Sequence, residues 1–415
     1  MIKKKVLIIA YHYPPANNGG IERPYRFAKY LPQYGYDPIV ITTDAYGQIE
    51  GEKDVFRFRD IVGQNVKKTS GILFFLLRAL RKIVVMIGLF SYGWYFTAKK
   101  NIENIVLNNK IDIVFSTYPP ITTVLLGLHL KRKYNIPLVV DFRDGFLFER
   151  CRKLNFVQEY CAKIIEKEIV KHADFIITVS PPITNYFKQR YKVRDLATIY
   201  NGFDTSDLDD IKDIDTPELE ERPFLMKYFG RFSKSSENRK PANLFKALSI
   251  LKEEGLISKD SFHLVMFTDL SESESSLIKK LKIENIVTVN TIINRDDALR
   301  EMKVCDFLLF HGDVGSSSVV STKLLEYIFM ETPILGICKN NEAEHVIEKT
   351  NTGIVTGFEV DEIIDGLKKA LNYNSRDFKP NYDEINKFTR KKITRELANV
   401  FTCIKQNAQT SKIFD

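Results

Sequence analysis

Short apolar runs that alternate with helical patterns constrain the fold of this chain more than any other feature. The first half holds five such runs, at residues 6–10, 38–42, 113–116, 138–140 and 175–179. Strands that are apolar along their whole length and separated by helices are typical of a parallel sheet covered on both faces. The pattern therefore predicts a Rossmann-like α/β domain over residues 1–203.

The same pattern restarts in the second half. Residues 204–222 are rich in Asp and Glu and show little apolar periodicity, as expected of a solvated linker. Six further apolar runs follow, at residues 224–229, 263–267, 286–289, 307–310, 333–337 and 353–355. They predict a second Rossmann-like domain over residues 223–381. Residues 382–415 then read as a charged amphipathic helix, which we expect to pack across both domains.

Composition excludes several classes of protein. Hydrophobic residues make up 44% and charged residues 27% of the 415, which is typical of a folded chain of two or three domains. The net charge of +8 suits anionic ligands or an anionic membrane face without requiring nucleic acid. Five cysteines without C-x-x-C spacing indicate neither a zinc site nor a disulfide framework, so a reducing cytoplasm is expected.

One apolar segment departs from the alternating pattern. Residues 71–98 are long enough to span a bilayer, but Arg78, Arg81 and Lys82 lie near the middle, and each such charge costs roughly 2.5–3.5 kcal/mol in a membrane span. With Trp94 near one end, the segment resembles a helix that lies on a membrane surface. The alternative is a helix half buried in the first domain.

Polar motifs follow the predicted strands of the first domain, at the sheet edge where open α/β proteins bind ligands. Gly19 and Gly20 precede a predicted helix and could let backbone N–H groups approach a phosphate or a sugar, unless they form a plain turn. Asp141, Arg143 and Asp144 follow residues 138–140. They suit sugar hydroxyls or proton transfer, and the rival interpretation is a purely structural ion-pair cluster.

Cationic side chains occupy the corresponding place in the second domain. Arg231 follows residues 224–229, and Arg239 with Lys240 precedes a helix predicted over residues 241–251. Arg and Lys suit a diphosphate whose charge grows as its bond breaks. The alternative is a solvated basic loop, which is a stronger rival for Arg239 than for Arg231.

A Ser-rich stretch leads into a helix predicted over residues 323–329. Ser321 or Thr322 can cap this helix, and its free N–H groups can then bind an anion. Lys323 lies in the first turn. Glu326, one turn in, could accept hydrogen bonds from two ribose hydroxyls, although an isolated Glu on a helix is usually solvated.

Histidines and acidic clusters give little sign of a metal site. His311 directly follows residues 307–310 and is kept as a candidate for donor binding, while His12 lies in the first loop and could also face the site. The acidic residues 207–210 lie in the predicted linker and read as solvated charge. We therefore expect neither a metal ion nor an organic cofactor.

With these residues assembled, the chain resembles the GT-B glycosyltransferases of the family 4 type, which build bacterial surface polysaccharides. The stretches that carry the resemblance occur in the family's order: VLIIAYHYPPANNGG, STYPPITTVLLGL, VVDFRDGF, ADFIITVSPPI, IYNGFD, YFGRF, NRKPANLFKAL and STKLLEYIFMETPILGI. The resemblance implies two facing Rossmann-like domains with a cleft between them and a C-terminal helix that crosses over. It also implies a retaining enzyme that needs no metal, with its nucleotide-sugar donor held mainly by the second domain.

The resemblance further implies roles for single residues. Gly20 would meet the donor phosphate, and Glu326 would hold the ribose. The leaving diphosphate would be stabilised by Arg231 and Lys240, and the transferred sugar or the acceptor would be faced by Asp141, Arg143 and Asp144. Many family members carry a second Glu where this chain has Ser318. What contacts the donor sugar in its place is left open.

The sequence therefore predicts a cytoplasmic transferase that moves a sugar to a lipid-linked or glycan acceptor. The basic surface and residues 71–98 could hold it at the inner face of the plasma membrane. Two alternatives remain at this stage. A sugar-nucleotide epimerase of the same architecture would need no acceptor, and a non-catalytic scaffold descended from a transferase would accommodate Ser318.

Overall fold

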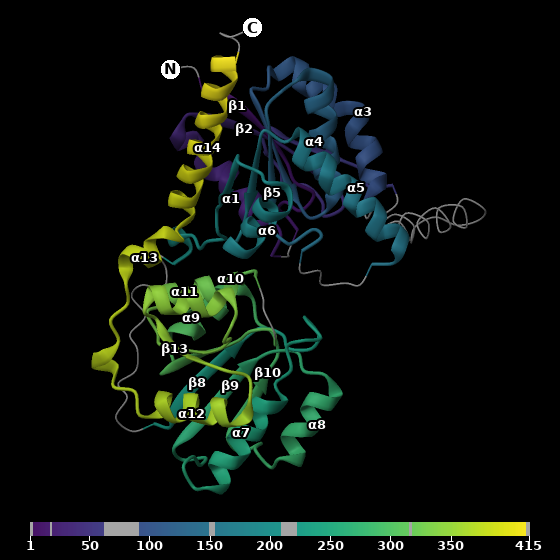
Figure 1. Ribbon diagram of the computed structural model, residues 1–415. Coiled ribbons are helices and arrows are strands. Elements are labelled where there is room, and N and C mark those ends of the chain that lie inside the picture. Colours follow the sequence, from purple (N-terminus) through teal and green to yellow (C-terminus); the bar gives the residue numbers. More distant parts are fainter. Residues whose placement is uncertain are drawn as a thin grey trace, which may run out of the picture. The chain divides into compact units, whose positions relative to one another are not determined.

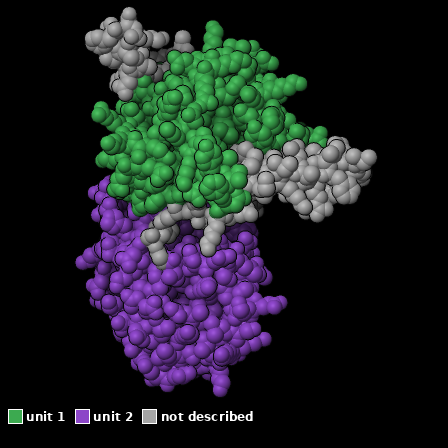
Figure 2. Space-filling model, turned by 45° about the vertical axis from the view of Figure 1, so that its right-hand side comes forward, with its two compact units in different colours: residues 1–200, 390–415 green, residues 201–389 purple. Residues whose placement is uncertain are grey.

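The computed structural model describes residues 3–16, 19–61, 91–148, 154–208, 222–314 and 318–411. The chain divides into two compact units (Figure 2). Unit 1 comprises residues 1–200 together with 390–415, and unit 2 comprises residues 201–389. Residues 209–221 of the predicted linker lie outside the described residues, and so do residues 71–90 of the predicted membrane-surface segment.

Unit 1 is built on a seven-stranded parallel sheet with the order β3-β2-β1-β4-β5-β6-β7. The strands are β1 (Lys4–Ile9), β2 (Tyr36–Thr43), β3 (Val55–Phe58), β4 (Ile113–Tyr118), β5 (Leu138–Phe142), β6 (Phe175–Thr178) and β7 (Leu196–Thr198). All five predicted runs are strands. The two strands that the sequence analysis missed, β3 and β7, are the short, half-buried edges of the sheet, where an apolar run is not needed.

Helices cover both faces of this sheet (Figure 1). They are α1 (Glu22–Tyr30), η1 (Leu31–Tyr34), α3 (Tyr92–Asn109), α4 (Ile121–Tyr134), α5 (Phe156–His172), α6 (Pro181–Tyr191) and α14 (Arg390–Ser411). Alternate residues of β1, Val6 and Ile8, pack in one cluster with Phe27 of α1 and Leu397 of α14. The C-terminal helix is thus part of the core of unit 1.

The C-terminal region is two helices where the sequence predicted one. The helix α13 (Tyr382–Lys387) belongs to unit 2, and α14 belongs to unit 1. Between them the Phe388 carbonyl accepts a hydrogen bond from the backbone N–H of Phe203 at 3.1 Å. The chain therefore passes from the first unit to the second and returns for its last helix.

Residues 92–98 form the start of α3. Trp94 is fully buried, and its Nε1 donates a hydrogen bond to the Thr42 carbonyl at 3.0 Å. The indole therefore belongs to the core of unit 1, whereas Phe96 on the same helix is 54% exposed. Among the described residues, no helix combines the length and the apolar character needed to cross a membrane.

Unit 2 repeats the architecture with six parallel strands in the order β10-β9-β8-β11-β12-β13. The strands are β8 (Phe224–Phe229), β9 (Phe262–Phe267), β10 (Val287–Asn290), β11 (Phe307–His311), β12 (Ile334–Ile337) and β13 (Gly353–Thr356). All six correspond to predicted runs. The helices are η3 (Thr205–Leu208), α7 (Ala242–Glu253), α8 (Glu272–Lys280), α9 (Arg295–Lys303), α10 (Thr322–Phe329), α11 (Glu342–Thr350), α12 (Val360–Leu371) and η4 (Ser375–Asp377). The predicted α/β class with two Rossmann-like domains is confirmed.

The strand order fixes where ligands can bind in each unit. In unit 1 the order reverses between β1 and β4, and in unit 2 it reverses between β8 and β11. Loops that leave the carboxyl ends of such neighbouring strands diverge to opposite faces of the sheet and open a crevice there. The candidate residues of the sequence analysis lie in or next to these loops.

Candidate functional site

A fully buried ion pair lies at the carboxyl edge of the unit 1 sheet. Asp141, near the end of β5, accepts hydrogen bonds from Nε and Nη2 of Arg23 on α1, at 3.0 and 2.8 Å. Thr117 on β4 donates a third at 2.8 Å. The side chains of Arg23 and Asp141 are 2% and 0% exposed. Because a buried charge needs its partners, this pair ties α1 to the centre of the sheet.

Arg143 holds the loops that surround this edge. Its guanidinium donates hydrogen bonds to the carbonyls of Tyr118 and Pro119, at 3.2 and 2.9 Å, and to the carbonyl of Gly20. Burial lowers the pKa of Arg143, an effect that Asp141 and Asp144 oppose. Gly19 is exposed, and, its chain neighbours apart, no atom of the described residues lies within 4 Å of the position that a Cβ would take there. The two glycines thus differ, because the Gly20 carbonyl is bonded to Arg143, whereas Gly19 is exposed.

Two titratable groups complete this edge. Asp144 is half-buried, and burial raises the pKa of its carboxyl although Arg143 opposes the shift. The imidazole Nδ1 of His12, after β1, lies 2.9 Å from the hydroxyl of Tyr46. Burial, and then the charge of Arg143, lower the pKa of His12 to about 4. His12 is therefore neutral at pH 7.

In unit 2, the loop after β8 presents cations. Gly230 has a φ of +153°, and a Cβ there would lie 3.1 Å from the Tyr228 hydroxyl. Arg231 and Lys240 are exposed, and neither has an ion-pair partner among the described residues. Arg239 differs, because its Nε lies 3.2 Å from Asp313. Of the two neighbouring cations, Lys240 is therefore the one left available to an anion.

His311 ends β11 beside this loop. It is 3% exposed, and its ring contacts the rings of Phe232 and Phe358 at centroid distances of 5.6 and 6.0 Å. Nδ1 lies 2.8 Å from the Gly312 carbonyl, which can only accept, so the proton is on Nδ1. Burial lowers the pKa of His311 to about 4. The ring is therefore neutral and packs against two aromatic rings, so it offers no positive charge to an anion.

The helix α10 begins where the sequence predicted. Ser321 is its N-cap, with a side chain that accepts a hydrogen bond from the Leu324 backbone N–H at 3.3 Å, and Thr322 is the first helical residue. The Tyr327 hydroxyl accepts a hydrogen bond from the Phe229 backbone N–H at 2.9 Å. This bond fixes α10 to the end of β8, next to Arg231. Ser318, at the position where an acidic residue is missing, is buried.

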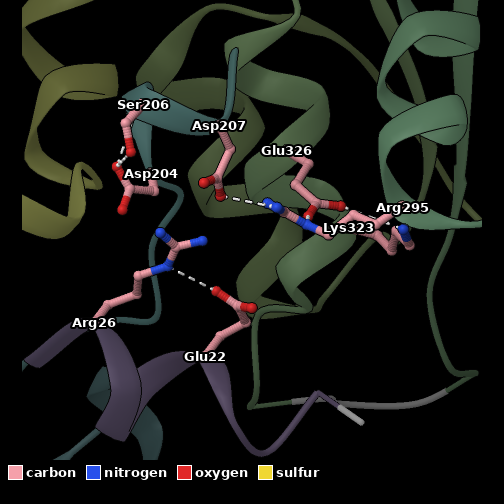
Figure 3. A network of polar contacts seen from close by, with 8 residues as sticks. All are labelled: Glu22, Arg26, Asp204, Ser206, Asp207, Arg295, Lys323 and Glu326. Atoms are coloured by element: carbon pink, nitrogen blue, oxygen red, sulfur yellow. Dashed lines mark hydrogen bonds and ion pairs between the residues drawn. The ribbon is translucent and has the colours of Figure 1, made fainter. Parts of the chain in front are cut away.

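Glu326 lies in a network of alternating charges (Figure 3). Its Oε1 accepts a hydrogen bond from Nε of Arg295 at 2.9 Å, and its Oε2 accepts one from Nζ of Lys323 at 3.3 Å. Nη1 of Arg295 donates another to Asp207, on η3, at 2.8 Å. Figure 3 also draws two separate pairs, Asp204 with Ser206 and, in unit 1, Glu22 with Arg26.

Sequence reasoning missed the residues that hold the candidates. Arg23, Asp313 and Arg295 are the partners of Asp141, Arg239 and Glu326. The two residues of these pairs lie 118, 74 and 31 positions apart in the chain, respectively. A lone charged residue at a helix start or after a strand gives no signal of such a partner. Only the pairing of strands, which places their loops side by side, could have suggested these contacts.

The chemistry that unit 2 can perform is anion binding at a sheet edge. Two exposed cations and a capped helix N-terminus can receive a diphosphate, and the buried carboxylate of Glu326 can receive hydroxyl groups. In the described part of the chain, no group of three or more His, Cys, Asp or Glu side chains could hold a metal ion.

Comparison with known proteins finds one family match and several similar folds. A profile of the Glycosyltransferase Family 4 matches residues 18–207. No curated protein sequence matches the chain at a significant level. Among solved structures, a glycosyltransferase from Rickettsia africae ESF-5 is similar with a TM-score of 0.65 and 15% identity, over 98% of this chain and 99% of that one.

Two further structures cover the whole architecture. The lipopolysaccharide outer core galactosyltransferase WaaB, in its apo form, gives a TM-score of 0.59 at 15% identity, over 96% of this chain and 99% of that one. The UDP-GlcNAc 2-epimerase from Methanocaldococcus jannaschii gives 0.55 at 14% identity, over 96% and 99%. At these identities the likeness shows the fold, and it is the fold that the sequence predicted.

Proposed function

We propose that the chain is a GT-B-fold glycosyltransferase of the family 4 type, which moves a sugar from a nucleotide-diphosphate sugar to a lipid-linked or glycan acceptor in cell-surface polysaccharide biosynthesis. The transfer retains the configuration of the sugar. The observation that carries this proposal is the pair of exposed cations Arg231 and Lys240, which have no ion-pair partner among the described residues, together with the capped helix α10 that is bonded to the end of β8. Such a set is suited to a leaving diphosphate and has no evident structural use.

In this proposal the donor binds at the carboxyl edge of the unit 2 sheet. Arg231 and Lys240 stabilise the charge that develops on the leaving diphosphate, which is the part a metal ion plays in other transferases. The N-terminus of α10, with Ser321, Thr322 and Lys323, binds a phosphate oxygen. Glu326, one turn further along α10, accepts hydrogen bonds from the ribose hydroxyls. Arg239 and His311 shape the site.

The acceptor binds at the edge of the unit 1 sheet. Asp144 and His12 are the half-buried titratable groups there, and they can orient the acceptor hydroxyl. Asp141 and Arg143 act by holding β5 and the surrounding loops in place, because their polar atoms are already engaged. The acceptor proton passes to the oxygen of the leaving diphosphate, so that transfer requires no strong base in the protein.

The proposed location is the cytoplasmic side of the plasma membrane, with peripheral attachment. The net charge of +8 supports it, since the cytoplasmic leaflet is anionic and attracts Lys and Arg. A lipid-linked acceptor would be presented at the same surface.

A second candidate function is epimerisation of a nucleotide sugar. The fold likeness to the UDP-GlcNAc 2-epimerase favours it as the alternative. An epimerase would change the nucleotide sugar without any acceptor, whereas a transferase would release the nucleoside diphosphate only when an acceptor is present. The two functions are therefore separable by their products.

The first test is thermal unfolding of the purified chain with UDP, GDP, ADP and several nucleotide sugars. A ligand that binds only the folded state raises the midpoint once its concentration exceeds its dissociation constant. We expect one nucleotide class to raise the midpoint and Arg231→Met with Lys240→Met to abolish the rise. If no nucleotide shifts the midpoint at millimolar concentration, the proposed donor site is wrong.

A further inference from the structure

We propose that Arg295 is a positioning residue of the donor site, which sets Glu326 in the orientation that selects a ribose over a deoxyribose. The inference rests on the proposed function, in which Glu326 receives the ribose hydroxyls. It concerns a residue on a different helix, α9, which that function leaves without a role. The argument is the geometry of the Asp207–Arg295–Glu326 chain (Figure 3).

Arg295 is held from two sides. Its Nε donates to Glu326 at 2.9 Å and its Nη1 donates to Asp207 at 2.8 Å, so both ends of the planar guanidinium are engaged. Burial alone lowers the pKa of Arg295, but Glu326 and Asp207 more than offset it, and the net shift is upward. The cation is therefore permanent, and its plane is fixed by two carboxylates rather than one.

The consequence for Glu326 is a defined orientation. A glutamate has three rotatable bonds, and on an exposed helix surface it samples many rotamers. Here the Glu326 side chain is only 10% exposed, and one of its oxygens is tied to a group outside its own helix. A carboxylate that is already oriented binds two hydroxyls without having to be ordered first.

Lys323 holds Glu326 less firmly than Arg295 does. It lies three residues earlier on the same helix, is 39% exposed and makes a longer contact, 3.3 Å to Oε2. No acidic partner besides Glu326 holds it among the described residues. A ribose hydroxyl can therefore take over Oε2 while Arg295 keeps Oε1 in place. Each carboxylate oxygen has lone pairs enough to accept a ligand besides its present donor.

The competing interpretation is a structural clamp that only joins η3, α9 and α10. The two interpretations predict different changes in ligand affinity. A clamp would affect the stability of the chain, or the affinity for all nucleotides equally. A positioning residue affects the affinity for ligands that carry the ribose hydroxyls and leaves their deoxy analogues nearly unchanged.

The experiment measures the dissociation constants of a nucleoside diphosphate and of its 2′-deoxy and 3′-deoxy analogues by calorimetry, with the base chosen by the thermal screen. The variants are Arg295→Met and Arg295→Lys. The matched control is Arg300→Met on the same helix, because Arg300 is 59% exposed and pairs only weakly with Asp297 at 3.9 Å. Thermal unfolding of every variant reports whether it folds.

The wild type should bind the ribose form about 10-fold or more tightly than the deoxy forms, since hydrogen bonds to a charged group are worth at least that much. Arg295→Met should lose about 10-fold in affinity for the ribose form and less than about 2-fold for the deoxy forms, so the preference collapses. Arg295→Lys should keep part of it, and Arg300→Met should keep all of it.

The inference is overturned if Arg295→Met keeps the ribose preference, or weakens all three ligands equally. It is also overturned if the wild type binds nucleotides without any ribose preference, in which case the donor site itself survives. If the wild type binds no nucleotide, the proposed function fails first. If Arg295→Met does not fold, Arg295→Lys and Asp207→Asn test the inference instead, by the ratio of their affinities for the ribose and deoxy ligands.

Discussion

His311 and His12 lie at the carboxyl edges of the two sheets, and the pKa of each imidazole is lowered to about 4, chiefly by burial. A histidine that is neutral in the folded chain and charged in the unfolded chain makes stability depend on pH. The stability that such a group contributes is present above its ordinary pKa of 6.5 and is lost as the pH falls towards 4. Both residues act in the same direction.

We predict that the free energy of unfolding falls as the pH is lowered from about 6.5 to 4, and that His311→Gln reduces this dependence by about 1.4 kcal/mol per pH unit. Urea unfolding at a series of pH values measures the slope. His345→Gln, at an exposed position on α11, is the control variant. An equal slope in the wild type and in His311→Gln would contradict the assignment.

At the residue scale, the sequence identifies which side chains lie at the carboxyl edges of the sheets. It does not identify which of them are free to contact a ligand. Asp141 and Arg231 both follow or end a strand, and both read as site residues. Asp141 is fully buried and accepts hydrogen bonds from three donor atoms, whereas Arg231 is exposed. The difference lies in partners such as Arg23, 118 positions away, and burial by distant partners leaves no mark in the local sequence.

At the scale of single elements, α10 is the helix on which the account of the donor site depends. It has eight residues, and its first turn is closed by the Ser321 side chain. The sequence predicted this helix within one residue, because a Ser before an apolar period is a strong start signal. It could not predict that Tyr327 would bind the end of β8, since that contact depends on the order of the strands.

We predict that Ser321→Ala destabilises the chain by about 0.5–2 kcal/mol in urea unfolding and weakens nucleotide binding, because the N–H groups of the first turn lose their cap. The matched control is Ser271→Ala, which removes the corresponding cap of α8, where the Ser271 side chain accepts from the Glu274 N–H. It should lower stability by a similar amount and leave nucleotide affinity unchanged. Equal losses of affinity in both variants would place the anion away from α10.

The interior strands could be predicted from the sequence, whereas two of the edge strands could not. Runs that are apolar throughout gave every interior strand of both sheets, because strands buried on both faces admit little else. The edge strands β3 and β7 were missed, since β3 carries Arg57 and β7 has only three half-buried residues. An edge strand needs only one neighbour and tolerates polar side chains.

At the scale of the whole molecule, the same architecture is built twice, with anchored acidic and basic groups at the edge of one sheet and available cations at the edge of the other. The last helix, α14, belongs to unit 1 although it follows unit 2 in the chain. The sequence predicted both domains from their alternating patterns. It predicted one C-terminal helix because the break at Phe388 carries neither Gly nor Pro.

The most direct test of the central claim is to follow the reaction by NMR, using the nucleotide sugar that stabilises the chain most and an acceptor fraction of lipid-linked saccharides. The account predicts release of the nucleoside diphosphate only with the acceptor present, in step with a new glycosidic bond that keeps the anomeric configuration of the donor. Conversion of the nucleotide sugar into its epimer without an acceptor, or a product of inverted configuration, would contradict it.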